Sequence, residues 1–398
     1  MSLEVGDDGR YVFTGMIPFR IGIVCYPTYG GSGVIATELG IGLADRGHQV
    51  HFISSSRPGR LSFHEQIYYH GVNVFSYPLF AYQPYESALA SKVVEVCSRH
   101  ALDLLHVHYA IPHASSGYMA REILKGRGYV LPLLTTLHGT DITLVGQDPS
   151  YAPVVAFSIQ SSDAVTAVSE NLREATYEYL GCKKDIEVIP NFVDLKRFSP
   201  PTQKDINKMR IHFCQHKKNQ ILIHVSNFRE VKNPLAVVRI FAQVQKQRDV
   251  CLLMVGEGPE RLEAQALSRS LGIEDQVHFL GEVDRVNDYL FLADVFLLPS
   301  LAESFGLAAL EAMACGVPVV ASNRGGLPDL IEEKKSGFLC DPMDLEAMTK
   351  AVLHILDNQK SFQQEARLRA SDFDLSNILP RYENLYSAIL KKAGKSKT

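Results

Sequence analysis

The sequence predicts an α/β fold made of two doubly wound, Rossmann-like domains. Three observations lead to this prediction. At 398 residues the chain is longer than one ordinary core can organise, so two domains of about 150–200 residues are expected. Each half alternates short apolar runs with stretches of helical period, as βα units do. Glycine-rich or polar loops follow several of the apolar runs, where open α/β sheets bind ligands.

The first half opens with a strand, a glycine loop and a helix. Arg20–Tyr26 is typical of a buried strand, Gly30-Gly31-Ser32-Gly33 follows, and residues 34–44 have helical periodicity. Such a loop lets a ligand approach bare backbone at a helix N-terminus. Its spacing differs from GxGxxG, which disfavours a nicotinamide dinucleotide. Further strands are expected at 49–53, 104–109, 131–137, 162–169 and 186–190, and further helices at 88–100 and 170–180.

Polar side chains gather where two of these strands end. Tyr109 and His113 follow one strand, and Thr136 and His138 end the next. Because the carboxyl ends of parallel strands face the ligand crevice, these side chains are candidates for binding. The histidines between positions 106 and 138 could also ligate a metal, but their spacing is poor for it and no metal site is expected.

The domain boundary is expected near residue 195, because residues 196–219 are polar and contain the breaker Ser199-Pro200-Pro201. We predict a disordered extension over 1–15 and a first domain over 16–195, to which a C-terminal helix at about 376–398 returns. The second domain spans 196–375. Its expected strands are 221–225, 250–255, 277–280, 295–298 and 317–321, and the expected helices of the second half are 234–247, 260–271, 286–292, 306–314, 343–356 and 378–390.

The stretch 299–318 carries the clearest functional pattern. An apolar strand precedes it, a polar turn opens it, and small and apolar residues in a helical pattern close it. Ser304 occupies the expected N-cap position. The amides that would then point outward at the positive end of the helix dipole belong to Phe305, Gly306 and Leu307. They form an anion site that a diphosphate would fit.

Two carboxylates flank this helix start. Glu303 lies just before it, and Glu311 lies about two turns inside it, roughly 10 Å further along the axis. With a diphosphate at the helix N-terminus, sugar hydroxyls would reach Glu303 and the ribose diol would reach Glu311 through charge-assisted hydrogen bonds. The spacing therefore indicates a nucleotide-sugar site.

Composition excludes several classes of partner. A net charge of −4 leaves no basic field for nucleic acid or an anionic membrane. No apolar run approaches the ~18 residues that span a bilayer, so no membrane anchor is expected. The seven cysteines show no CxxC or pairing pattern, and we expect them to be reduced thiols of a cytoplasmic protein.

These motifs together resemble those of the retaining GT-B glycosyltransferases of family four. Glu303 and Glu311 form an E-x7-E pattern within Glu-Ser-Phe-Gly…Glu-Ala-Met-Ala-Cys-Gly-Val-Pro-Val-Val. The other landmarks follow in the family's usual order and are Gly30 to Gly33, Val188-Ile-Pro-Asn191, Val255-Gly-Glu-Gly258-Pro and Gly325-Gly326-Leu-Pro328. The resemblance implies two domains that face an interdomain cleft, with the acceptor bound by the first domain and the donor by the second.

Four longer stretches are similar to a narrower group of that family. Its members transfer N-acetylglucosamine from UDP-GlcNAc to the hydroxyl of L-malate, with retention, in the first step of bacillithiol biosynthesis. The resemblance also implies a homodimer and no cofactor. The similar stretches are Cys25-Tyr-Pro-Thr-Tyr-Gly-Gly-Ser-Gly-Val-Ile-Ala-Thr-Glu38, His106-Val-His-Tyr-Ala-Ile-Pro-His113, Thr135-Thr-Leu-His-Gly-Thr-Asp141 and His224-Val-Ser-Asn-Phe-Arg229.

Carried over by position, the resemblance assigns catalytic roles to His138, Glu303 and Lys232, with Lys232 on the donor diphosphate and His138 near the sugar. Relatives commonly have an arginine where this chain has Asn227, and Arg229 two positions later is a candidate replacement. The donor-binding set implied by the resemblance and the helix pattern is Gly31, Asn227, Arg229, Lys232, Glu303, Ser304, Phe305, Gly306, Leu307 and Glu311. The acceptor-binding set is Ser32, Tyr109, Thr136 and, as a candidate for the malate carboxylates, Arg173.

The expected chemistry needs no metal, because Lys232, Arg229 and helix amides could stabilise the charge that develops on the leaving UDP. No carboxylate nucleophile stands out in the first domain, since Asp141 and Glu38 also have structural interpretations. We therefore expect a front-face mechanism. Three alternatives stay open: a family-four transferase that uses an inositol phosphate, lipid or glycan acceptor, a UDP-GlcNAc 2-epimerase, and a nucleotide-sugar-binding module without catalysis.

Overall fold

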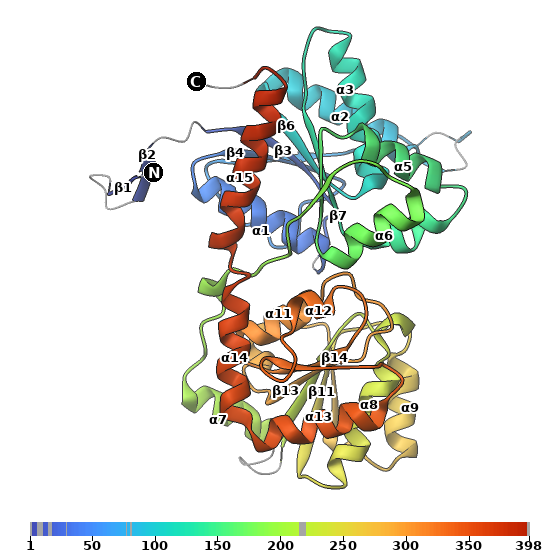
Figure 1. Ribbon diagram of the computed structural model, residues 1–398, viewed down its shortest axis with the longest axis vertical. Coiled ribbons are helices and arrows are strands. Elements are labelled where there is room, and N and C mark those ends of the chain that lie inside the picture. The colour runs from blue at the N-terminus through green and yellow to red at the C-terminus, as the bar shows by residue number, and fades with distance from the viewer. Residues whose placement is uncertain are drawn as a thin grey trace. The chain divides into compact units, whose positions relative to one another are not determined.

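The computed structural model describes residues 2–5, 11–14, 18–28, 30–76, 78–79, 82–214 and 220–395. These residues fall into two compact units. Unit 1 holds the described residues up to Pro190 and those from Leu375 onward, and unit 2 is Asn191–Asp374. The sequence-based boundaries were placed near 195 and 375. Figure 1 shows that each unit is a central sheet with helices on both faces.

Unit 1 contains a parallel sheet whose seven described strands have the order β5-β4-β3-β6-β7-β8-β9. The chain starts at β3, moves outward to β5, and then reverses to continue from β6 on the other side. The carboxyl ends of β3 and β6 therefore lie at a topological switch point, where doubly wound sheets bind ligands. The strands are β3 (Arg20–Val24), β4 (Gln49–Ser54), β5 (Ile67–Gly71), β6 (Leu104–His108), β7 (Leu133–Leu137), β8 (Ala164–Ala167) and β9 (Ile186–Val188).

The helices of unit 1 cover both faces of this sheet (Figure 1). The first follows the glycine loop, as the sequence predicts, and the last is the C-terminal helix, which contacts the first. They are α1 (Ser32–Asp45), α2 (Tyr85–His100), α3 (Ser115–Lys125), α4 (Thr140–Thr143), α5 (Ala152–Ser161), α6 (Glu170–Leu180) and α15 (Leu375–Lys392).

Unit 2 repeats this topology with the six described strands in the order β12-β11-β10-β13-β14-β15. Here the switch point lies between β10 and β13. The strands are β10 (Gln220–Val225), β11 (Val250–Val255), β12 (Val277–Gly281), β13 (Val295–Leu298), β14 (Val319–Ser322) and β15 (Gly337–Cys340). The helices are α7 (Gln203–Phe213), α8 (Pro234–Gln245), α9 (Arg261–Ser270), α10 (Val286–Leu290), α11 (Leu307–Ala314), α12 (Leu327–Leu330), α13 (Leu345–Asp357) and α14 (Gln359–Ser371).

Three expectations are corrected. Residues 2–5 and 11–14 form an antiparallel pair, β1 and β2, instead of a disordered extension; Tyr-Val-Phe-Thr at 11–14 has the β-branched and aromatic composition of a strand. The other positions of 1–15 lie outside the described residues. Cys214 and Cys251 form a disulfide with Cα atoms 6.2 Å apart, which their 37-residue separation gave no reason to expect. The polar stretch 196–219 contains helix α7.

No helix within the described residues combines the length and the apolar character needed to cross a bilayer.

A buried ion pair fixes α15 to the body of unit 1. The Arg46 guanidinium donates to both oxygens of Glu383 at 2.6 and 2.8 Å, and His48 Nε2 lies 3.1 Å from the same carboxylate. The Phe19 amide donates to His48 Nδ1, so Nε2 carries the proton and donates to Glu383. Burial alone would raise the pKa of Glu383, but the bonds from His48 and Arg46 hold this pKa below its usual value.

Replacing Glu383 should therefore destabilise unit 1. We expect Glu383→Gln to lower the free energy of unfolding by about 3 kcal/mol, because Arg46 and His48 lose their buried anion. Urea unfolding followed by circular dichroism measures this. Glu178→Gln, which changes an exposed glutamate of the same unit, serves as the control. A loss below about 0.5 kcal/mol in the Glu383 variant would show that the pair does not hold the helix in place.

Candidate active site

Helix α11 begins at Leu307, two residues later than an N-cap at Ser304 would give. Gly306 is the N-cap, with φ 96°, a value that favours glycine. A Cβ at this position would also lie 2.6 Å from a methyl group of Leu327. The predicted cap is therefore wrong, because the left-handed conformation of Gly306 turns the chain. The outward-facing amides of the first turn are those of Leu307, Ala308 and Ala309.

The carboxylates before and within α11 sit in different surroundings. Glu303 lies in the loop between β13 and α11, and its carbonyl oxygen accepts a hydrogen bond from the Gly326 amide at 2.8 Å. A Cβ on Gly325 would come within 1.9 Å of that oxygen, so only glycine lets this loop approach so closely. Glu311 is buried within α11. It is four residues past the helix start, or about 6 Å, which is nearer than the two turns expected from the sequence.

Lys232 reaches this loop from the neighbouring strand. It ends the short helix η4 (Glu230–Lys232) after β10, and its Nζ lies 2.5 Å from Glu303 Oε2. A backbone bond from Leu301 N to Val231 O at 2.8 Å aligns the two segments. Both side chains keep part of their surface exposed, 23% for Lys232 and 13% for Glu303. The topological switch point of unit 2 therefore carries an accessible cation, an accessible anion and a helix N-terminus.

Asn227 and Arg229 lie on the same loop after β10. Both side chains are exposed, while Phe228 between them is buried with φ 35°. The loop is therefore not extended, although it presents both side chains to solvent. The proposed replacement of the family's arginine by Arg229 stays a prediction.

Support for this loop comes from two groups within the motifs, His224 and Gly258, to which the sequence assigned no role. His224 Nδ1 donates to the Leu297 carbonyl at 2.8 Å, which leaves Nε2 to accept from Ser226 Oγ at 2.7 Å. A Cβ on Gly258 would come within 1.9 Å of the Asn227 carbonyl, so the loop after β11 also needs glycine. A histidine in an apolar strand was the available signal, but one of its partners, the Leu297 carbonyl, is 73 residues away in sequence.

In unit 1, Ser32 and Tyr109 meet at the other switch point. Ser32 is the first residue of α1, Tyr109 follows β6, and Ser32 Oγ donates to the Tyr109 hydroxyl at 3.0 Å. Tyr109 has φ 83°, a strained value for a residue with a side chain. Burial raises the pKa of Tyr109 to about 12, so its hydroxyl is a neutral donor. Gly31, the N-cap of α1 with φ 59°, has open space around it.

His138 packs beside this pair. Its ring lies 5.1 Å from the Tyr109 ring, and its Nε2 lies 2.8 Å from His108 Nδ1. Burial lowers the pKa of His138 to about 3, so the imidazole is neutral at pH 7. Asp141 holds the loop, since its buried carboxylate accepts the amides of Ala110, His138 and Gly139 at 3.0, 3.3 and 3.0 Å. Asp141 is thus a positioning residue.

Two of the predicted acceptor residues lie in other settings. Thr136 is fully buried, and its Oγ1 bonds to His106 Nε2 and to Thr166 Oγ1, both at 2.7 Å. Its hydroxyl is buried within the sheet and joins neighbouring strands, so the structure corrects that assignment. Arg173 is half-buried on α6 and pairs with Glu170. It keeps guanidinium donors for a carboxylate, and its role stays a prediction.

Comparisons with known proteins give consistent results. A family described as Glycosyltransferase Family 4 matches residues 29–197, and one described as Glycosyl transferases group 1 matches residues 206–371. The N-acetyl-alpha-D-glucosaminyl L-malate synthase of Bacillus anthracis is 43% identical over 377 residues, 94% of this chain and 97% of that protein. The D-inositol 3-phosphate glycosyltransferase 2 of Catenulispora acidiphila is 28% identical over 309 residues, 72% of this chain and 70% of that protein.

Among solved structures, a glycosyltransferase from Rickettsia africae matches with a TM-score of 0.77 at 22% identity, covering 94% of this chain and 99% of that one. This likeness concerns the fold. It confirms the predicted GT-B class with its two Rossmann-like domains.

Proposed function

Because the chain belongs to the family-4 glycosyltransferases, we propose that it transfers N-acetylglucosamine from UDP-GlcNAc to the hydroxyl of L-malate with retention of configuration. This reaction is the first step of bacillithiol biosynthesis. The observation that carries the proposal is the 43% identity to a synthase of that name over almost the full length of both chains. The charged and polar groups found at each switch point also support the proposal.

The donor is assigned to unit 2. The diphosphate would lie on the first-turn amides of α11, whose partial positive charge favours an anion. Glu303 would accept hydrogen bonds from the hexose hydroxyls, and Glu311 from the ribose. Charge-assisted bonds of this kind contribute about 1.5–3 kcal/mol each. In this assignment Ser304 and Phe305 determine the shape of the loop, and the amide of Leu307 binds the diphosphate.

The pair between Lys232 and Glu303 prepares this site for catalysis. With no donor bound, the two charges at 2.5 Å hold each other in place. A bound donor offers the ammonium group a diphosphate and offers the carboxylate two hydroxyls. The negative charge on the leaving UDP grows in the transition state, so Lys232 and the neighbouring Arg229 bind that state more tightly than the ground state.

The acceptor is assigned to unit 1. The hydroxyls of Ser32 and Tyr109 and the N-terminus of α1 form a polar site for a small dianion, with Arg173 as a candidate for one carboxylate. His138 would lie near the sugar as a neutral donor. Asp141 is occupied by three amides, and Glu38 pairs with Arg60 at 2.9 Å, so neither is offered as a nucleophile. The departing phosphate oxygen therefore takes the proton from malate as the new bond forms on the same face.

Removal of the tyrosine hydroxyl tests the acceptor site. Tyr109→Phe should raise KM for L-malate about tenfold, the cost of one hydrogen bond of about 1.4 kcal/mol, with KM for UDP-GlcNAc unchanged. Initial rates at varied malate measure this. Tyr179→Phe, at an exposed tyrosine on α6, is the matched control. An unchanged KM for malate in Tyr109→Phe would remove this residue from the acceptor site.

One assay separates the proposed function from its alternatives. The protein is incubated with UDP-GlcNAc with and without L-malate, and UDP and sugar products are measured. UDP release that requires malate, with GlcNAc-malate as product, supports the proposal. ManNAc species without an acceptor would indicate an epimerase, and release of UDP only with inositol phosphate, a lipid or a glycan would indicate a different transferase. Binding without turnover would indicate a module without catalysis.

Three further properties belong to the proposal. Transfer needs no metal, so EDTA should leave its rate unchanged. The protein is cytoplasmic, which agrees with its five free thiols, although Cys214 and Cys251 are paired. It is a homodimer, supported by an exposed apolar patch on α3 and α5 whose four members are each at least 40% exposed. A monomer mass in light scattering would contradict the dimer. The patch consists of Met119, Ile123, Val154 and Phe157.

A further inference from the structure

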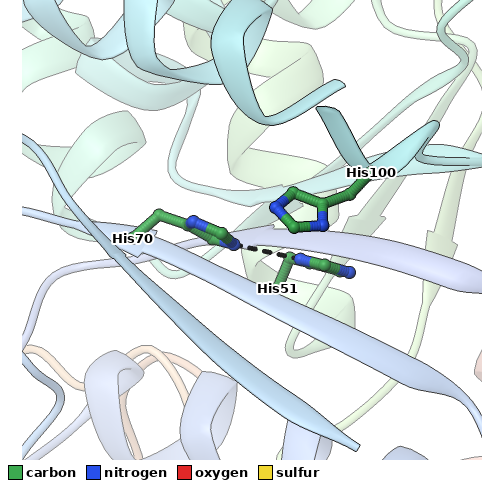
Figure 2. Close-up of side chains that lie close together, drawn as sticks. All are labelled: His51, His70 and His100. Carbon is green, nitrogen blue, oxygen red and sulfur yellow. Dashed lines mark hydrogen bonds between the residues drawn. The ribbon is translucent and has the colours of Figure 1, made fainter. Parts of the chain in front are cut away.

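Three histidines from separate elements of unit 1 meet beside the sheet edge (Figure 2). His51 comes from β4, His70 from the edge strand β5, and His100 is the last residue of α2. In the parallel register His51 pairs with Tyr68. Side chains two apart share a face, so His70 lies on the same side of the sheet as His51. The end of α2 places the third ring over that face.

The ring nitrogens lie close together. His51 Nδ1 is 3.0 Å from His70 Nε2, and one nitrogen from each of the three rings lies within 4.8 Å of the others. Imidazole nitrogens bound to Zn²⁺ at about 2.0–2.1 Å in a tetrahedron are about 3.4 Å apart. The facing nitrogens of His51 and His70, which are 3.0 Å apart, therefore need to separate by a few tenths of an ångström. The third ring needs a larger rotation, and its position at a helix end permits it.

The imidazoles are ready to act as ligands. An imidazole has an ordinary pKa of about 6.5, so at pH 7.5 such rings are mostly in the neutral form that binds a metal. One of the two facing nitrogens carries the hydrogen of their bond. A metal would need that hydrogen on the other nitrogen of the same ring, a change of tautomer that releases no proton. His51 Nε2 is buried without a hydrogen-bond partner among the described residues.

Charged side chains surround the three rings, but none of the three proposed ligands is a carboxylate, and this limits which ion fits. Arg20 disfavours positive charge at His51, and Lys92 and Arg99 disfavour it at His70, while Glu95 favours it. Glu95 itself pairs with Lys92 at 2.7 Å and with Arg99 at 3.1 Å. Three imidazole nitrogens without a carboxylate suit Zn²⁺, Ni²⁺ or Cu²⁺ and not Mg²⁺ or Ca²⁺, which need oxygen ligands.

We propose that His51, His70 and His100 bind one divalent late transition metal ion such as Zn²⁺, with water in the fourth position. His51 is buried, but His70 and His100 are partly exposed, so an ion can enter from solvent. The ion would link the edge strand β5 to β4 and to the end of α2. The ion takes no part in the transfer, because it lies away from the proposed acceptor site. Helix α2, which carries His100, ends before the start of β6, whereas Tyr109 follows the end of β6.

Zinc binding by the untagged full-length chain tests this. Protein stripped with a chelator is titrated with ZnCl₂ against a chromophoric zinc indicator at pH 7.5, and thermal unfolding is followed with and without zinc. The native chain should bind about one Zn²⁺ and unfold at a higher temperature with zinc, because the ion binds only the folded state. His100→Gln and His70→Gln should each weaken binding at least tenfold and abolish the thermal shift. His354→Gln, at an exposed histidine of unit 2, should behave as the native chain does.

Two results would overturn the proposal. Equal zinc affinity in the native chain and in His100→Gln would place the ion elsewhere, for example on free thiols. No zinc binding by the native chain would mean that the three rings are only a polar packing cluster. His100 lies at a helix end with a partly exposed ring, so its variant remains interpretable even if His70→Gln fails to fold.

Discussion

Glu303→Gln should lower kcat/KM for GlcNAc transfer by two to three orders of magnitude. The amide keeps the size of the side chain but removes the charge that we propose to accept the sugar hydroxyls. It also leaves Lys232 without the anion that lies 2.5 Å away in the free protein. Loss of one preorganised polar group of an active site typically reduces kcat by about 10²–10³. Initial rates of UDP release at varied UDP-GlcNAc and fixed L-malate measure the effect.

The matched control is Glu346→Gln, because Glu346 is an exposed glutamate of the same unit that pairs only with Lys350 in the described structure. Its kinetics should equal those of the native chain. Both variants should have native thermal stability, which separates a catalytic effect from a folding defect. A Glu303→Gln protein with more than a tenth of the native activity would exclude a direct contact between Glu303 and the reacting sugar.

Mild acid should destabilise unit 1 strongly. Burial lowers the pKa of His106 and His138 to about 3 and that of His113 to about 4, and it lowers the pKa of His108 well below its usual value. In the unfolded chain the same groups bind protons near pH 6.5. The unfolded state therefore binds more protons as the pH falls below 6.5, and the stability lost grows until the pH approaches the folded values.

Each of His106, His113 and His138 lowers the free energy of unfolding by about 1.4 kcal/mol per pH unit, or about 2 kcal/mol at pH 5. These three together cost about 6 kcal/mol, which is comparable to the whole stability of a domain, and His108 acts in the same direction. Urea unfolding at pH 7.5, 6.0 and 5.0 measures the loss, with circular dichroism or tyrosine fluorescence as the probe because the chain has no Trp.

A matched pair of variants identifies the source of the acid effect. His138→Asn should reduce the pH slope by one proton, whereas His354→Gln, at an exposed histidine, should keep the native slope. Stability that stays constant between pH 7.5 and pH 5.0 would show that the four rings accept protons in the folded state.

Much of the fold could be predicted because βα units repeat a simple pattern. The strands buried on both faces were visible as apolar runs, and the breaks after them located both switch points. Strand β5 was missed because it is an edge strand whose residues are all at least partly exposed, so its sequence Ile-Tyr-Tyr-His-Gly has neither an apolar run nor an alternating pattern. Helix α7 was not predicted because its composition is polar and prolines precede it.

The sequence could predict the site residues whose positions follow from the order of strands and loops. It could not predict those whose positions depend on contacts between residues distant in sequence. Glu303 and Lys232 follow neighbouring strands of one switch point, as the motifs indicated. Ser304 was assigned the cap on residue preference, but the backbone of Gly306 determines where the helix begins. Thr136 was placed with the acceptor because it ends a strand. Its hydroxyl is instead held by His106 on β6 and Thr166 on β8, and no sequence pattern reveals those bonds.

The central claim is that Glu303 binds the sugar of the donor while α11 binds its diphosphate and Glu311 its ribose. Calorimetric titration of the native chain, Glu303→Gln and Glu311→Gln with UDP and with UDP-GlcNAc tests it most directly. The account predicts that Glu303→Gln keeps its affinity for UDP but loses the extra affinity that the sugar provides, whereas Glu311→Gln weakens both ligands alike. Equal losses for UDP and UDP-GlcNAc in Glu303→Gln, or no loss in either variant, would contradict it.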